Sequence, residues 1–221
     1  MKRVVRWAAL LLSAGVAACA GTLKATGVAD PALARAALDS TAPTQPLRVV
    51  FDWRMRERDG RFHGQGVARV EPPARARIDL FGPRGDGLLS AALVDGTVRM
   101  PTNQQTVDLP PPPMMWAVLG VVEPPAGAQL ISTAQKGDRV QLLYLDGGGR
   151  LRYDLDRGRL RGVQWDGPGN RRYTVQLEGD TLGVPGKAVY RDWSGYVELV
   201  IELKQVEDVD PYPPETWTPT R

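Results

Sequence analysis

Residues 47–56 read LRVVFDWRMR, and this stretch decides the fold class. Its odd positions carry Leu47, Val49, Phe51, Trp53 and Met55, while four of its five even positions are charged. A period of two is typical of a β-strand that buries one face and exposes the other to water. The stretch therefore predicts an antiparallel strand with one apolar face.

The same alternation recurs along the chain, with turn signals between the alternating stretches. Asp59-Gly60 and Asp95-Gly96 are strong hairpin signals, and residues 146–149 (DGGG) form another turn. In all, about ten to twelve short strands are expected, which predicts an all-β barrel or a curved sheet. The further strands are expected over residues 61–70, 74–80, 88–94, 97–100, 104–109, 139–145, 150–156, 159–165, 171–177 and 197–203.

Two stretches read as short helices. Asp30 precedes Pro31, and an aspartate cap followed by proline at the first helical position favours a helix, here over residues 31–39. The apolar residues 114–122 (MMWAVLGVV) lie between prolines 110–113 and Pro124-Pro125. They predict a second short helix packed on the sheet, with a fully buried strand as the alternative.

The N-terminus reads as a lipoprotein signal. Residues 1–18 combine a basic start, a short apolar run and a small-residue cleavage site, which is the pattern of a secretory signal peptide. The apolar run is shorter than the roughly 20 residues that a membrane-spanning helix needs. Cys19 follows Ala18 directly, as in the lipobox of bacterial lipoproteins, so we expect lipidation at Cys19 and a tether over residues 19–30. The alternative is an ordinary cleaved signal with a chance cysteine.

The charge and cysteine content limit which partners and which stabilising bonds the chain can have. The chain has 221 residues and a formal charge of +3, but cleavage before Cys19 removes Lys2, Arg3 and Arg6 and leaves 25 basic against 25 acidic residues. A neutral mature chain gives no electrostatic argument for nucleic acid. Because Cys19 is the only cysteine, disulfides cannot brace the fold.

No residue pattern indicates catalysis, a cofactor or a metal site. His63 is the only histidine, and no nucleophile or metal partner accompanies it in the sequence. Asp154 and Asp156 share one side of an expected strand, but arginines surround them, so a solvated ion-pair face is the better interpretation. The glycine-rich stretches lack the strand–loop–helix setting of a phosphate loop and read as turns. We therefore do not expect an enzyme.

The apolar face is the remaining feature. It is either a closed core or the wall of a cavity for an apolar ligand, since curved antiparallel sheets can enclose one. The Met114-Met115-Trp116 segment favours the cavity, because methionine adapts to varied apolar partners. The expected lipid tether, which places the domain beside a membrane, favours it too.

The order of these elements resembles a known family. The lipobox, the short helix and the strand with Phe51 and Trp53 precede residues 77–85 (RIDLFGPRG), and a proline-flanked segment and a closing strand over residues 195–203 follow. The chain resembles the periplasmic lipoprotein carrier and outer-membrane receptor family (LolA/LolB-like). The resemblance covers most of residues 30–206. We assign residues 31–206 to one domain and residues 207–221 to an acidic, proline-rich tail.

The resemblance implies a fold and a site. The fold would be a curved antiparallel sheet of about eleven strands forming an incomplete (half) barrel with short lid helices. Its concave face would hold the acyl chains of lipoproteins in transit or another lipid, with a periplasmic carrier as a partner. As plain core residues the same side chains would look identical in the sequence. The positions that map onto the cavity by pattern are Phe51, Trp53, Ile78, Leu80, Met114, Met115, Trp116 and Leu119.

The resemblance also implies a location. A lipidated chain matches the outer-membrane receptor branch, and Ala20 in place of an aspartate favours outer-membrane sorting. In that branch a Pro-x-Gly loop near the membrane carries an apolar residue, whereas Pro83-Arg84-Gly85 carries arginine here. Arginine binds headgroups and does not insert as a hydrocarbon plug, so this departure puts receptor-type release in doubt.

A structural role is the alternative function. In it the chain is an envelope scaffold with a filled β core and no ligand. The tail supports this role, because four acidic residues lie among prolines there and predict an extended segment that a partner can reach. Simple disorder is the other interpretation of the tail.

Overall fold

The computed structural model describes residues 28–102 and 109–219. Within them, one sheet of 12 antiparallel strands has the order β5-β4-β3-β2-β1-β12-β11-β10-β9-β8-β7-β6. The first strands are β1 (Leu47–Arg56), β2 (Arg61–Glu71), β3 (Arg75–Phe81), β4 (Gly87–Val94) and β5 (Thr97–Arg99). The others are β6 (Gln129–Lys136), β7 (Arg139–Asp146), β8 (Gly149–Asp156), β9 (Arg159–Asp166), β10 (Arg172–Glu178), β11 (Lys187–Asp192) and β12 (Val197–Asp208).

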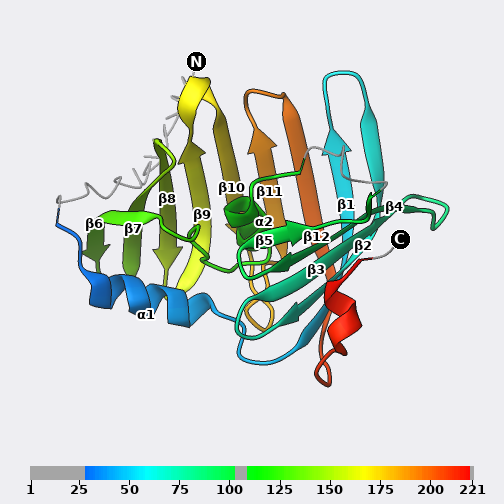
Figure 1. Cartoon of the computed structure of the whole chain (residues 1–221), viewed down its shortest axis with the longest axis horizontal. Helices are drawn as coiled ribbons and strands as arrows, with labels where there is room; N and C mark the ends of the chain where they lie inside the picture. The colour runs from blue at the N-terminus through cyan, green and yellow to red at the C-terminus, as the bar shows by residue number, and fades with distance from the viewer. Residues whose placement is uncertain (1–27, 103–108, 220–221) are drawn as a thin grey trace, which may run out of the picture.

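The sheet is strongly curved and does not close. Figure 1 shows β3 and β4 crossing in front of the long back wall of the sheet, so that the front is the concave side. The edge strands β5 and β6 lie at opposite ends of the strand order and do not pair. The predicted mainly-β, unclosed antiparallel sheet with short helices is therefore confirmed, with twelve strands in the described residues where about eleven were expected.

Two strands were missed, and two expectations fall outside the residues that the structure describes. No strand was expected at β6 or β11. The structure does not describe residues 103–108, which contain almost all of the strand expected over residues 104–109. The expected lipidation site Cys19 also lies outside the described residues.

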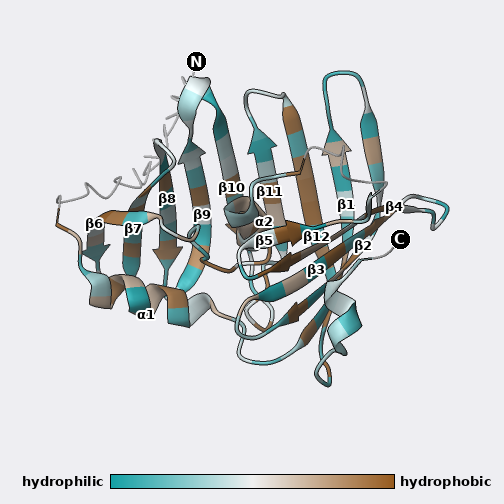
Figure 2. Ribbon diagram, viewed as in Figure 1, coloured by the Kyte–Doolittle hydropathy of each residue, from teal (hydrophilic) through white to brown (hydrophobic). Residues whose placement is uncertain are grey.

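Strand β1 forms the middle of the sheet and follows the predicted alternation. It pairs with β2 on one side and β12 on the other, and Val49, Phe51 and Trp53 are buried on the concave side. Figure 2 shows the corresponding alternation of polar and apolar residues along the strands. Gly66 lies opposite Phe51, and a Cβ there would come within 2.3 Å of the Phe51 ring. The glycines of β2 thus leave room for the large rings of β1.

Helix α1 (Pro31–Thr41) begins as predicted and ends two residues later than expected. Asp30 caps it, because its Oδ1 accepts hydrogen bonds from the backbone N–H of Ala32 (2.9 Å) and Leu33 (3.2 Å). The helix runs across the lower ends of β6 to β9 in Figure 1. Its buried Ala34 and Ala37 join the core on that side.

Helix α2 (Pro112–Val118) lies on the concave side at the centre of the sheet (Figure 1). The helical interpretation of this segment is confirmed, and the buried-strand alternative is wrong. Met114 to Ala117 are buried, so the helix is a packed part of the core as well as a cover.

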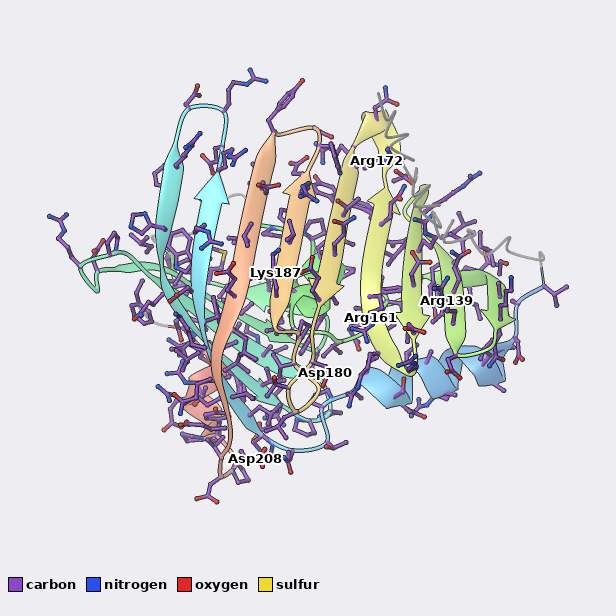
Figure 3. All side chains as sticks on the ribbon, turned by 180° about the vertical axis from the view of Figure 1, so that it is seen from behind. Arg139, Arg161, Arg172, Asp180, Lys187 and Asp208 are labelled. Carbon is purple, nitrogen blue, oxygen red and sulfur yellow. The ribbon has the colours of Figure 1, made fainter. Side chains whose placement is uncertain are left out.

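The convex face is polar, and many of its charged side chains form ion pairs. Figure 3 shows charged side chains along the back of the sheet. Cross-strand ion pairs include Arg54 with Glu202 (2.6 Å) and Arg191 with Glu198 (2.8 Å). Asp154 accepts from Arg152 at 3.1 Å, which agrees with the ion-pair interpretation of that strand.

The C-terminal segment packs on the convex face of β3 and β4. The expectation of an extended tail available to a partner, or of a disordered one, is wrong for this segment as far as residue 219. It carries the short helix η3 (Pro214–Trp217), and Trp217 is buried against Ala92 and Val94. The Tyr212 hydroxyl donates to the Leu47 carbonyl oxygen at 3.0 Å. Apolar contacts and hydrogen bonds to the sheet therefore hold this segment in place, although its prolines and charges alone favour an extended chain.

Candidate ligand pocket

Helix α2 divides the concave side into two halves. Met114 and Ala117 pack in one hydrophobic cluster with residues of β7 to β11. Met115, Trp116 and Leu119 pack in a second cluster with residues of β1 to β4. Consecutive residues of one short helix therefore pack against opposite halves of the sheet, and the two halves differ in how completely side chains fill them.

The half over β1 to β4 is filled. Phe51, Trp53 and Ile78 are buried there, Leu80 is half-buried against the same cluster, and Met115 and Leu119 cover them from α2. A void of about 20 Å³ remains beside Phe51, Ile78 and Leu119. That volume is close to what one water molecule needs and is far too small for an acyl chain.

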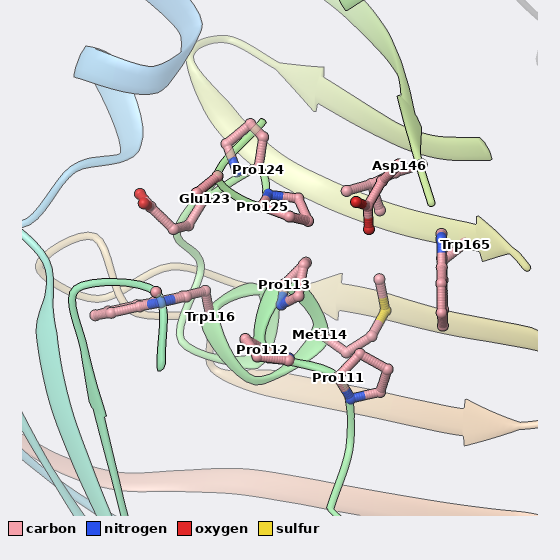
Figure 4. Close-up of a pocket in the computed structure, with 13 residues that line it drawn as sticks. Pro111, Pro112, Pro113, Met114, Trp116, Glu123, Pro124, Pro125, Asp146 and Trp165 are labelled. Carbon is pink, nitrogen blue, oxygen red and sulfur yellow. The ribbon is translucent and has the colours of Figure 1, made fainter. Parts of the chain in front are cut away.

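The other half holds a pocket of about 400 Å³ (Figure 4). It lies between α2, the segment that follows α2, the turn between β4 and β5, and the strands β7, β8 and β9. Most of the lining is apolar, and proline rings form much of it. The described residues that line it are Gly96, Pro111, Pro112, Pro113, Met114, Trp116, Glu123, Pro124, Pro125, Ala126, Asp146, Leu151 and Trp165.

Three polar groups interrupt the apolar lining. Two are the carboxylates of Glu123 and Asp146, and the third is the indole N–H of Trp165. Trp165 Nε1 is buried and has no hydrogen-bond partner within the described residues. No lysine, arginine or histidine is among the described lining residues, so nothing basic compensates the two carboxylates at the pocket wall.

Burial raises the pKa values of two side chains at or beside the pocket wall, Glu123 and Tyr153. Loss of water around the carboxyl group raises the pKa of Glu123 above its ordinary value. The Tyr153 hydroxyl donates to the Glu123 carbonyl oxygen at 3.0 Å, which ties the segment after α2 to β8. Burial, followed by the nearby Tyr144, Glu123 and Asp146, raises the pKa of Tyr153 well above its ordinary range. Tyr153 is therefore a neutral donor at every physiological pH.

An aromatic stack fixes the far wall of the pocket. The Trp165 ring stacks on Tyr173 with centroids 5.2 Å apart, and Tyr173 stacks on Tyr190 at 6.2 Å. A Cβ at Gly149 would lie 2.6 Å from Trp165 Nε1, so only glycine fits the neighbouring strand there. Trp165 is thus held in place before any ligand binds.

The predicted cavity residues separate into three groups. Met114 and Trp116 line the pocket, whereas Phe51, Ile78 and Leu119 border only the small void. Trp53, Leu80 and Met115 border neither space. Glu123, Asp146 and Trp165 were not predicted to lie at the site. The only feature of the sequence that pointed to this region was the pair of proline groups around residues 114–122.

The predicted membrane-proximal loop lies elsewhere. Pro83, Arg84 and Gly85 are exposed at the turn between β3 and β4, where Gly85 has φ +82° and donates its N–H to the Gly82 carbonyl oxygen at 2.9 Å. Figure 1 shows this turn projecting from the side of the sheet, away from the pocket.

In the part of the chain that the structure describes, no group of three or more His, Cys, Asp or Glu side chains is placed to hold a metal ion. No helix among residues 28–102 and 109–219 is long and apolar enough to cross a membrane. His63 is exposed on β2, opposite Arg54.

The fold of this chain is similar to that of several solved structures. It matches the LolA superfamily protein NE2245 from Nitrosomonas europaea with a TM-score of 0.57 at 12% sequence identity, covering 86% of this chain and 98% of that one. It matches a Vibrio parahaemolyticus domain assigned as an outer membrane lipoprotein-sorting protein with a TM-score of 0.52 at 4% identity, covering 84% and 94%. No protein-family model and no curated protein matches the sequence.

These matches concern the fold. They extend over most of both chains, so the likeness concerns the overall fold and not a single motif. The resemblance seen in the sequence is confirmed at this level, because the chain has the fold of a LolA superfamily protein.

Proposed function

We propose that this chain is a lipid-binding protein of the bacterial envelope that holds an acyl chain in the pocket beside α2, without a cofactor and without catalysis. The observation that carries the proposal is the mostly apolar pocket of about 400 Å³ on the concave side of the sheet. Its volume falls within the range of about 300–1,000 Å³ that is usual for small-molecule sites.

The energetics suit a transient carrier. Burying a methylene contributes about 0.8 kcal/mol, so about eight methylenes supply roughly 6 kcal/mol before the cost of ordering the chain. Without the ordering cost, this free energy would correspond to a Kd on the order of tens of micromolar, so the ordering cost makes the net binding weaker than that. An acyl chain held this loosely can be released to a membrane without an energy source.

The proposed cellular location follows from the N-terminal sequence. Lipidation at Cys19 would anchor the chain at the periplasmic face of the outer membrane, with lipoprotein acyl chains or another lipid as cargo and a periplasmic carrier as donor. The fold shared with an assigned lipoprotein-sorting domain supports this role. Arg84 differs from the apolar residue of the receptor branch, so release through Pro83-Arg84-Gly85 is not part of the proposal.

Ala126→Trp tests the pocket. Ala126 is exposed and lines the pocket, so an indole at this position occupies the space without disturbing the buried core. Uptake of a lysophosphatidylethanolamine with a pyrene-labelled acyl chain is expected to fall by at least about tenfold, since loss of two buried methylenes alone exceeds about 1.4 kcal/mol. The measurement is pyrene fluorescence against protein concentration. Ala126→Ser is the matched control and should bind as the unaltered chain does; equal uptake by the tryptophan variant would exclude this pocket.

Glu123→Gln tests the charge at the wall. A bound acyl chain removes more water from Glu123, so binding should strengthen as the pH falls through the raised pKa of this carboxyl. The glutamine variant should lose that pH dependence and bind on the order of tenfold more tightly at pH 7, which corresponds to about 1.4 kcal/mol.

The same substitution should affect stability. A carboxyl whose folded-state pKa is raised stabilises the fold fully below its unfolded pKa, near 4.5, and loses that contribution as the pH rises through the folded pKa. Glu123→Gln should therefore raise the unfolding midpoint at pH 7 and leave it nearly unchanged at pH 4. Glu178→Gln, on the exposed end of β10, is the control and should change neither binding nor stability. A pH dependence that persists in Glu123→Gln would assign it to another group.

A scaffold role is the second candidate. The filled half of the concave side, with its void of about 20 Å³, favours it for that region. It requires that the unaltered chain take up no acyl probe even at concentrations well above the Kd expected for acyl binding, and that it co-purify with a stable envelope partner.

A further inference from the structure

Three turns meet at one end of the sheet. They comprise residues 56–62 between β1 and β2, residues 166–172 between β9 and β10, and residues 192–197 between β11 and β12, and we call them together the rim. Figure 1 shows the three turns at the top of the sheet, whereas α1 crosses the opposite ends of the strands. Among the residues that the structure describes, helix α1 therefore covers part of the opposite end, and no helix covers the rim.

The rim is one connected surface. The Trp193 N–H donates to the Arg172 carbonyl oxygen at 3.0 Å, which joins the second and third turns. The Arg58 guanidinium lies 4.9 Å above the centre of the Tyr196 ring, which joins the first turn to the third. Side chains on the three turns can therefore contact one flat partner together.

Exposed aromatic side chains gather on the rim. Phe62, Trp193 and Tyr196 are 48%, 56% and 65% exposed, and they are all of the strongly exposed aromatic residues in the described part of the chain. Trp193 is held at the surface, because its Nε1 donates to Thr174 Oγ1 at 3.1 Å. Tyr196 has φ +58°, a strained conformation for a bulky residue.

Guanidinium groups surround these rings. Arg56, Arg58, Arg61 and Arg171 form no ion pair with any described residue, whereas most convex-face arginines are paired. The rim also holds four acidic residues against five arginines, but two of the four are already engaged. Asp166 pairs with Arg172 at 2.8 Å, and Asp192 Oδ1 accepts from the Ser194 N–H at 2.8 Å. The rim has a net formal charge of +1, and its four arginines without an ion-pair partner among the described residues outnumber Glu57 and Asp59, the two carboxylates that remain.

We propose that the rim docks on an anionic lipid surface. Tryptophan and tyrosine are enriched where proteins meet lipid headgroups, because their rings are apolar and their tips polar. Arginines beside them bind anionic headgroups at about 1 kcal/mol each. The combination on one uncovered end of the sheet fits a membrane better than it fits a protein partner, whose contact would bury a more continuous apolar patch.

The rim is next to the pocket. Trp165, which lines the pocket, directly precedes the turn over residues 166–172 on β9. Docking of the rim therefore brings the pocket wall within one or two residues of the headgroup layer. This orientation would shorten the path of an acyl chain between pocket and bilayer, but rim docking does not depend on acyl binding and is tested separately.

Vesicle flotation tests the rim. The chain is used from residue 19 onward with Cys19→Ser, which removes the anchor and keeps both hydrophobic clusters. The unaltered rim should float with vesicles of phosphatidylcholine and phosphatidylglycerol and much less with phosphatidylcholine alone. Trp193→Ala/Tyr196→Ala and Arg58→Glu/Arg171→Glu should each weaken binding at least about tenfold. The matched controls Leu182→Ala and Arg157→Glu, exposed at the opposite end, should bind as before.

The outcomes separate the two proposals. Equal flotation of the rim and control variants, or no flotation of the unaltered chain, overturns rim docking; in the second case a protein contact becomes the explanation of the rim. Uptake of the pyrene probe in vesicle-free solution should be unchanged in the rim variants. If that uptake is absent in every variant while flotation depends on the rim, the acyl-binding function fails and rim docking stands.

Discussion

Replacing Trp116 with alanine is expected to lower the free energy of unfolding by about 4 kcal/mol, the largest single effect that we predict. Trp116 is 1% exposed and is among the largest fully buried side chains of the described residues. It belongs to the cluster of β1 to β4 and also lines the ligand pocket. Its removal therefore opens a cavity in the filled half and loosens α2 from the sheet.

Binding should fail together with stability. The pocket wall depends on the position of α2, because Met114 and Pro113 reach the pocket from the same short helix. Trp116→Ala should thus lose most uptake of the pyrene probe even under conditions in which the chain is still folded. Urea unfolding followed by far-UV circular dichroism gives the stability, and probe titration at low urea gives the binding.

Trp193→Ala is the matched control for Trp116→Ala. It removes the same side chain from a site that is 56% exposed, and the expected change in unfolding free energy is below about 0.5 kcal/mol. Similar unfolding midpoints for the two variants would show that α2 does not anchor the core.

The sheet could be predicted where the alternation is undisturbed. Strand β1 matches its predicted range of 47–56 to the residue, because one face is buried along nearly its whole length. Strand β6 was missed because a bulge between Leu130 and Ser132 breaks the period of two that identifies a strand. Strand β11 has only six residues, too few for the pattern to be distinct.

The pocket could be predicted only in part. Met114 and Trp116 were accessible because prolines bound the apolar segment that carries them. Glu123, Asp146 and Trp165 come from three separate stretches, and only the sheet register and the docking of α2 bring them together. Trp217 illustrates the same point, since its burial against β4 cannot be read from an acidic, proline-rich sequence.

Asp79→Ala is expected to cost about 3 kcal/mol of unfolding free energy, and a nearly identical pair on another strand provides its control. Asp79 lies on β3 and accepts hydrogen bonds from Arg77 Nε (3.1 Å), from Ser90 Oγ (2.6 Å) and from Arg69. Its side chain is 9% exposed and that of Arg77 is 20% exposed. Alanine would leave two half-buried guanidinium groups without their shared carboxylate, and the cost of that desolvation sets the size of the effect.

Asp154→Ala makes the comparison decisive. Asp154 accepts from Arg152 Nε at the same distance, 3.1 Å, and with the same spacing of two residues along a strand, but the two side chains are 40% and 41% exposed. Water and salt screen such a pair, so its loss should cost less than about 1 kcal/mol. Urea unfolding of both variants at low and high NaCl measures the difference. Burial sets the energy of these pairs if Asp79→Ala is the more destabilised at both salt concentrations, and equal losses would show that hydrogen-bond geometry alone determines it.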